Sequence, residues 1–218
     1  MLNYTVLHAG YAVCALIGYL LGCVNAAYIV GKFHGRDIRK AGSHNAGATN
    51  TMIVFGLKAG LMVAVIDIAK AVIAVMLAER LFGSLLFAGV VAGVSSVFGH
   101  AFPFWMGFRG GKGFASFLGL ILASSGWIAF FAAIGATALI TVVGDKISVA
   151  TISVMASYPV MMYFMGFDVA AILLVSLASA AMIVKHRENI ARLRRGEELG
   201  LRSYRARRAA GEVAEDDI

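Results

Sequence analysis

Long apolar runs separated by short polar breaks fill most of the chain. Seven such segments follow one another, at 5–30, 53–77, 83–106, 114–124, 127–143, 147–165 and 168–184. Several are near the ~20 residues that a helix needs to cross the hydrocarbon core of a bilayer. The pattern therefore predicts an all-α, polytopic integral membrane protein with about seven membrane-spanning helices. A count of five, with the shortest segments at the membrane surface, is the alternative.

One apolar run is too long for a single ordinary span. It extends from 114 to 143, and the small and polar residues Ser124, Ser125 and Gly126 interrupt it. Such residues favour a turn between periodic segments. We therefore expect the chain to turn there, which leaves a short segment at 114–124 that is tilted or spans only partly.

Composition supports the membrane assignment. The chain has 218 residues, of which 60% are hydrophobic and 14% charged, and its mean hydropathy is +0.83. A soluble domain is about half apolar and about a quarter charged. The composition thus argues against a soluble enzyme, a disordered linker and a nucleic-acid-binding module, despite the net charge of +7. Membrane lipids are the expected partners, and nucleic acid is not.

The basic residues orient the chain in the membrane. With the N-terminus outside, 16 of the 19 Lys and Arg residues fall on one side, in the loops 31–52 and 107–113, at Lys146 and after 184. Cytoplasmic loops carry such an excess. We predict that the N-terminus lies outside and the C-terminus in the cytoplasm. Residues 1–196 are expected to form one membrane-embedded domain, and 197–218 a cytoplasmic tail that is first basic and then acidic.

Unusual polar residues gather in three patches, at 37–50, 99–116 and 185–197. All three fall on the predicted cytoplasmic side, which indicates one shared site. In the second patch, Gly110, Gly111 and Gly113 permit close approach of backbone N–H groups to an anion, and Lys112 adds a charge. A helix that begins near 114 would direct its positive end there. The chemistry these residues suit is phosphate binding.

Structural explanations exist for each feature taken alone. A Gly-Gly-Lys-Gly sequence often forms only a tight turn, and a basic tail often only binds anionic lipid. Asp67 and Lys70, three residues apart in an apolar segment, are expected to form a structural pair, and His100 to cap a helix. No cluster of His, Cys and carboxylate residues predicts a metal site, and no cofactor is expected.

The order of the three patches resembles the acyl-phosphate:glycerol-3-phosphate acyltransferases, the PlsY family. The sharpest matches are Gly42-Ser43, Asn45 and Gly47–Asn50, then Gly99-His100, Phe102-Pro103 and Phe108–Gly113, then His186–Ile190 with Arg192-Leu193. The resemblance implies transfer of a fatty acyl group from acyl phosphate to the 1-hydroxyl of glycerol 3-phosphate, which gives lysophosphatidic acid for phospholipid biosynthesis. Acyl phosphate and glycerol 3-phosphate are then the substrates, and the oligomeric state is open. Because the family is bacterial, the resemblance also implies localisation in the bacterial inner membrane, with the active site on the cytoplasmic side.

The resemblance also implies residue roles. Lys112, His186 and Asn189 are the expected catalytic residues, with His186 or the donor's own phosphate as proton acceptor. The expected substrate-binding residues are Arg39, Ser43, Asn45, Thr49, Asn50, Gly110, Gly111, Gly113 and Ser148.

The chain departs from the family pattern at four positions. His44 stands where the family usually has Gly, Cys23 where it has Ser, Arg109 where it has Lys, and Ile53 where it has Arg. The last change keeps open a non-catalytic or altered-specificity lipid-binding paralogue. A small transporter is a further alternative. No His is followed five residues later by Asp, which excludes the His-x4-Asp dyad of acyl-CoA acyltransferases.

Overall fold

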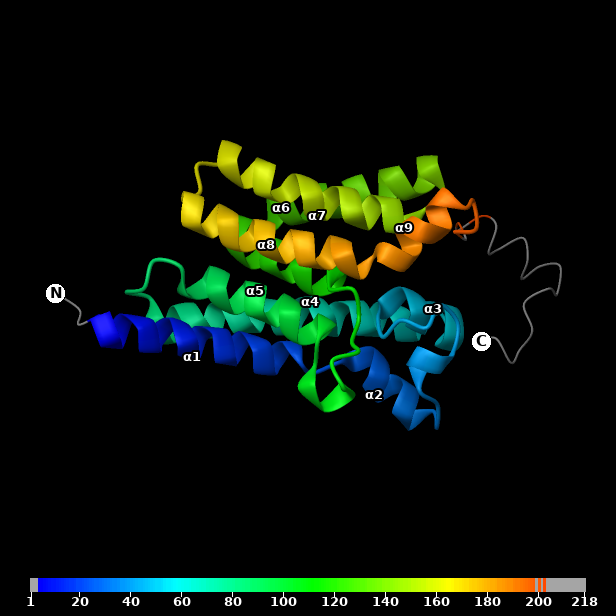
Figure 1. Cartoon of the computed structure of the whole chain (residues 1–218), viewed down its shortest axis with the longest axis horizontal. Helices are drawn as coiled ribbons and strands as arrows, with labels where there is room; N and C mark the ends of the chain where they lie inside the picture. The colour runs from blue at the N-terminus through cyan, green and yellow to red at the C-terminus, as the bar shows by residue number, and fades with distance from the viewer. Residues whose placement is uncertain (1–3, 199, 201, 203–218) are drawn as a thin grey trace.

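The computed structural model describes residues 4–198, 200 and 202, and every regular element in this part of the chain is a helix (Figure 1). The α-helices are α1 (Tyr4–Gly22), α2 (Ala26–Phe33), α3 (Ala48–Phe55), α4 (Leu57–Phe82), α5 (Ala88–Ala101), α6 (Phe114–Gly144), α7 (Ile147–Phe164), α8 (Val169–Lys185) and α9 (Arg187–Arg194). Two short 3₁₀ helices, η1 (Ile38–Lys40) and η2 (Phe104–Met106), lie in the loops. The predicted all-α class is confirmed.

The described helices include five that are long and apolar enough to cross a membrane: His8–Phe33, Leu57–Phe82, Ala88–Met106, Phe114–Gly144 and Ile147–Phe164. The pair α8 and α9, bent by 53°, brings the number to six. The sequence-based estimate of about seven differs because Phe114–Gly144 enters this number as a single helix, although its backbone angles leave the helical region at Gly126. The orientation of the termini stays a prediction.

Helix α6 folds back on itself at Gly126, where the sequence predicted a turn. Gly126 has φ 78° and ψ −176°, a region that only glycine occupies readily. A straight helix of 31 residues would be about 46 Å long. Yet the residues flanking its two ends are linked through short contacts, Lys112 to Asn189, Asn189 to Glu198, and Glu198 to Lys146. The two legs of α6 therefore run in opposite directions (Figure 1).

Small residues bring α1 and α5 into backbone contact. A Cβ at Gly18 would lie 2.0 Å from the Ala92 carbonyl oxygen, and one at Gly22 would lie 2.2 Å from that of Ser96. Glycine permits such close packing between helices in a bilayer, where the hydrophobic effect supplies no drive for association. The tight seam fixes the end of α1 next to the end of α5, and both ends lead into site loops.

The larger core lies between α5, α6, α7 and α8 and includes Phe117, Ile121, Met155 and Met182. Helix α6 begins and ends near the same end of the bundle as the loop 34–47, the loop 102–113 and α9 (Figure 1). The bundle therefore carries all three polar patches at one end.

Candidate active site

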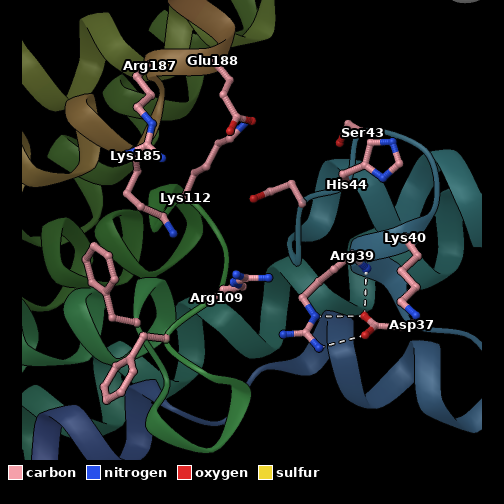
Figure 2. A pocket seen from close by; sticks show the side chains of 14 residues that line it. Asp37, Arg39, Lys40, Ser43, His44, Arg109, Lys112, Lys185, Arg187 and Glu188 are labelled. Carbon is pink, nitrogen blue, oxygen red and sulfur yellow. Dashed lines mark hydrogen bonds and ion pairs between the residues drawn. The ribbon is translucent and has the colours of Figure 1, made fainter.

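One pocket of about 630 Å³ opens at this end of the bundle (Figure 2). It is lined by Asp37, Arg39, Lys40, Ser43, His44, Asn45, Phe102, Phe108, Arg109, Gly110, Lys112, Lys185, Arg187 and Glu188. All three polar patches contribute, so the structure brings them together as the sequence predicted. Figure 2 shows Lys112, Lys185 and Arg187 on one wall, and Ser43 and His44 on the other.

The pocket is strongly positive. Six of its lining residues are Lys or Arg, and two, Asp37 and Glu188, are acidic. A concave site lined by one sign of charge concentrates ions of the opposite sign. Two apolar rings, Phe102 and Phe108, complete the lining. The arrangement suits phosphorylated ligands, one of which carries an apolar part.

Asn50 organises the first loop from behind the pocket. It is fully buried, its side-chain oxygen accepts from Ser43 N, and its amide nitrogen donates to the carbonyls of Ile38 and Ala41 at 2.9 and 3.0 Å. Every hydrogen-bonding atom of the Asn50 amide group is thus used within the protein. Neither Asn50 nor the exposed Thr49 lines the pocket, whereas Ser43 and Asn45 do.

Arg39 is committed to the protein. Its Nε and one terminal nitrogen bind the Asp37 carboxylate at 3.0 and 2.8 Å, and the other donates to the Met106 carbonyl at 2.9 Å. These hydrogen bonds, partly offset by burial, hold the pKa of Asp37 below its usual range. Arg39 thereby joins the first loop to η2, and its charge is largely neutralised by Asp37.

The glycines of the second patch are needed for close packing. The N–H groups of Gly110 and Gly111 donate to the carbonyls of Ala101 and His100 at the end of α5, each at 3.1 Å. These two N–H groups are therefore not available to an anion, contrary to the expected role. The N–H groups of Lys112 and Gly113 have no hydrogen-bond partner in the described part of the chain, and they precede α6. An anion at this helix start would meet those two.

Lys112 is held by a hydrogen-bonded chain behind the pocket wall. Its ammonium donates to the side-chain oxygen of Asn189, whose nitrogen donates to Glu198 at 2.6 Å. Glu198 also accepts from Arg192 at 2.7 Å. Burial, assisted by repulsion from Arg192, lowers the pKa of Lys112 to about 8. Because both ends of the Asn189 amide are bound, its oxygen faces Lys112.

His186 and Ser148 lie deeper than the pocket lining. The Nδ1 of His186 donates to the Met182 carbonyl at 2.8 Å, and its Nε2 lies 3.3 Å from the Thr151 hydroxyl. The Ser148 hydroxyl has no hydrogen-bond partner in the described residues, although it lies close enough to Glu198 to help lower the pKa of that carboxyl. A substrate would have to displace the Thr151 contact to reach His186.

Lys185 and Arg187 belong to the third patch and flank His186, and both line the pocket. Glu198 was not expected at the site, because it falls in the predicted tail beyond the third patch. Residues 199, 201 and 203–218 of that tail lie outside the described residues. No group of His, Cys, Asp and Glu residues in the described chain could hold a metal ion.

Comparison with known proteins identifies the family. A model of the family described as glycerol-3-phosphate acyltransferase matches residues 12–196. The chain belongs to the glycerol-3-phosphate acyltransferase (PlsY) family. It is 39% identical over 192 residues to the glycerol-3-phosphate acyltransferase of Thermoanaerobacter pseudethanolicus, covering 86% of this chain and 94% of the relative. It is 35% identical over 207 residues to glycerol-3-phosphate acyltransferase 1 of Oceanobacillus iheyensis, covering 92% and 99%.

Solved structures of PlsY (YgiH), an integral membrane glycerol 3-phosphate acyltransferase, share the fold. The glycerol 3-phosphate form superposes with a TM-score of 0.82 at 32% identity, covering 88% of this chain and 95% of that one. The lysophosphatidic acid form superposes with a TM-score of 0.79 at 32% identity, covering 87% and 94%. The resemblance drawn from the three motifs is confirmed.

Backbone geometry accounts for the glycine that is usual in the PlsY pattern at position 44. His44 has φ 55°, in the left-handed region that favours glycine, the usual residue there. Its side chain lines the pocket. Ile53 does not line the pocket, and its Cγ2 would lie 3.3 Å from a Cβ at Gly42. Position 53 therefore supports the first loop at Gly42.

Proposed function

We propose that this PlsY-family protein transfers a fatty acyl group from acyl phosphate to the 1-hydroxyl of glycerol 3-phosphate. The product is lysophosphatidic acid. The protein lies in the inner membrane of a bacterial cell, and its pocket opens on the cytoplasmic side. The observation that carries the proposal is the positive pocket to which all three polar patches contribute, with Phe102 and Phe108 in its lining and Lys112 at its wall. Both substrates bear phosphate, and the donor alone bears an apolar chain.

The reaction needs no covalent acyl-enzyme. The 1-oxygen of glycerol 3-phosphate attacks the carbonyl carbon of acyl phosphate, a C–O bond forms, and the C–O bond to phosphate breaks. The hydroxyl proton goes to the departing phosphate, or to Nε2 of His186 if its contact with Thr151 opens. Positioning and charge stabilisation are then the main contributions of the protein.

We assign roles from the contacts. Lys112, oriented by Asn189, stabilises negative charge on the reacting carbonyl or the departing phosphate. Ser43 and Asn45 on the opposite wall contact the polyol. Asn50 and Arg39 act indirectly, because their side-chain hydrogen bonds within the protein hold the first loop in shape.

The donor assay tests the proposal. Purified protein should form lysophosphatidic acid from glycerol 3-phosphate and acyl phosphate, and a metal chelator should not reduce the rate. Acyl-CoA should not replace the donor. Equal rates with acyl-CoA, or loss of activity on chelation, would contradict the proposed donor and mechanism.

A second candidate, a non-catalytic lipid-binding paralogue, rests on Ile53. If the missing Arg weakens substrate binding, Ile53→Arg should lower the KM for glycerol 3-phosphate. His44→Gly should raise it, because the pocket loses a polar lining residue. Absence of acyl transfer by both the native protein and Ile53→Arg, where another family member is active, would favour the paralogue.

A further inference from the structure

Three buried ionisable side chains meet beneath the second loop. Asp67 and Lys70 lie on α4, and His100 lies in the last turn of α5. The Lys70 ammonium is 2.7 Å from the Asp67 carboxylate and 2.9 Å from Nδ1 of His100. It also donates to the Val24 carbonyl at 2.7 Å. The side chains of all three residues are at most 5% exposed.

The ammonium of Lys70 is fully used by these contacts. It has three N–H donors, and three acceptors surround it, on Asp67, His100 and Val24. A buried charge is tolerated where its hydrogen bonds are satisfied in this way. Lys70 therefore fixes three segments of the chain relative to one another, namely α4, the end of α5, and the break between α1 and α2.

His100 connects this cluster to the glycines next to Lys112. Its backbone carbonyl accepts from Gly111 N at 3.1 Å. Its ring fills the space beside Gly111, where a Cβ would lie 2.1 Å from His100 Nε2. Gly111 is thus held from both the backbone and the side chain of His100. The next residue is Lys112.

The break between α1 and α2 connects the cluster to the first loop. Val24 binds Lys70, and its neighbour Asn25 donates to the Ala46 carbonyl at 3.2 Å. Ala46 also touches the Gly111 position, since a Cβ there would lie 2.6 Å from the Ala46 oxygen. The first and second loops, which form opposite walls of the pocket, therefore both depend on the position of Lys70.

We propose that Lys70 is a positioning residue for acyl transfer, which acts through His100 and Gly111 to set the place of Lys112. This goes beyond a structural ion pair, because it couples a side chain inside the bundle to a cation in the pocket. Lys70→Met should therefore lower kcat/KM by about tenfold or more. The catalytic readout rests on the proposed function.

A double-mutant cycle separates positioning from general stability. If Lys70 acts through Lys112, then Lys70→Met should have little further effect on kcat/KM in a Lys112→Ala background. Additive losses would overturn the proposal, and so would an unchanged kcat/KM for Lys70→Met alone. Tyr158→Phe is the matched control, because it removes a partly buried hydrogen bond, to Ser125 at 2.8 Å, away from the site. Any decrease in kcat/KM caused by Tyr158→Phe should add to the decrease caused by Lys112→Ala.

Lys70→Met leaves a buried carboxylate whose Oδ2 has no hydrogen-bond partner in the described residues, and this variant could fail to fold. Asp67→Asn combined with Lys70→Met removes both charges together, and the same criterion applies to it.

A second readout is independent of acyl transfer. Acetylation of Lys112 by a water-soluble reagent, followed by mass spectrometry on the purified full chain, reports how open its surroundings are. Relative to the exposed Lys32, the rate at Lys112 should rise about threefold or more in the Asp67→Asn/Lys70→Met variant, since local contacts are lost. It should not rise in Tyr158→Phe. An unchanged rate in the double variant would overturn the proposal even if the native protein transfers no acyl group.

Discussion

At the scale of single residues, the cations of the pocket divide into bound and free. Arg39 is paired with Asp37, Lys112 is bound by Asn189, and Lys185 donates to the Ala101 carbonyl at 3.2 Å. The side chains of Lys40, Arg109 and Arg187 make no hydrogen bond or ion pair within residues 4–198. A phosphate dianion would pair first with these, because no protein contact has to break.

Lys112 should give the reaction an alkaline limit. Its pKa is lowered to about 8, so its ammonium is lost as the pH rises through that value, and kcat/KM should fall. A bound dianion favours the charged form, so the fall in kcat should occur at higher pH. Pre-steady-state or initial-rate profiles between about pH 6 and 10 would measure both limits; below about pH 6 the phosphate itself takes up a proton.

Two variants check this assignment. Lys112→Ala removes a charge-assisted contact of roughly 1.5–3 kcal/mol, which corresponds to about 10- to 150-fold in rate or affinity. Lys112→Arg keeps its charge at any accessible pH. The alkaline limit should therefore disappear in the Arg variant, whatever its absolute rate. Persistence of the limit would assign it to another group.

Glu198 should matter for both stability and turnover. Burial alone would raise the pKa of its carboxyl, but hydrogen bonds from Asn189 and Arg192 outweigh burial and lower it. Glu198→Ala should cost roughly 1.5–3 kcal/mol, as for other charged hydrogen bonds, and should slow turnover because Asn189 is no longer oriented. The control is Glu197→Ala, whose exposed pair with Arg195 should contribute little. Thermal unfolding and initial rates distinguish the two; equal effects would contradict the assigned role.

At the scale of elements, glycines serve two separate purposes. A Cβ at Gly111 would clash with His100 and Ala46, whereas one at Gly126 would meet no atom within 4 Å. Gly111→Ala should therefore displace the second loop and abolish most activity. Gly126→Ala should cost about 1–3 kcal/mol through backbone strain alone, and it should lower the unfolding temperature with little change in KM. The reverse pattern would show that the α6 turn, not the loop, shapes the pocket.

The sequence predicted elements better than contacts. Apolar runs located the long helices, and the Ser-Ser-Gly sequence located the turn in α6, because both signals are local. The same reasoning missed the break at Gly56, where φ 87° and ψ 171° separate α3 from α4. It also missed Glu198, since nothing in the local sequence shows that a charged residue beyond α9 returns to Asn189. Motif residues predicted the pocket walls, but only the fold distinguishes Ser43, which lines the pocket, from Asn50, which supports it.

At the scale of the whole molecule, the position of the site predicts which side of the membrane it faces. The patches gather at one end of the bundle, and the charge distribution predicts that this end faces the cytoplasm. Cys14 and Cys23 are buried, so an introduced cysteine can be labelled selectively. In intact cells an impermeant thiol reagent should label Leu86→Cys, at the opposite end of the bundle, and should not label Arg195→Cys. Labelling of Arg195→Cys before the cells are opened would reverse the topology.

The unequal legs of α6 bear on where the reaction takes place. The first leg, 114–125, is about 18 Å long and the second, 127–144, about 27 Å. Both leave the same turn, so the glycines before Phe114 lie about 9 Å nearer to that turn, measured along the legs, than Asp145 does. If the donor is acyl phosphate, as proposed, it can present its carbonyl carbon to Lys112 while its chain stays in hydrocarbon. A reactive centre at the level of Asp145 would require the donor to rise toward water, at about 0.8 kcal/mol for each methylene exposed.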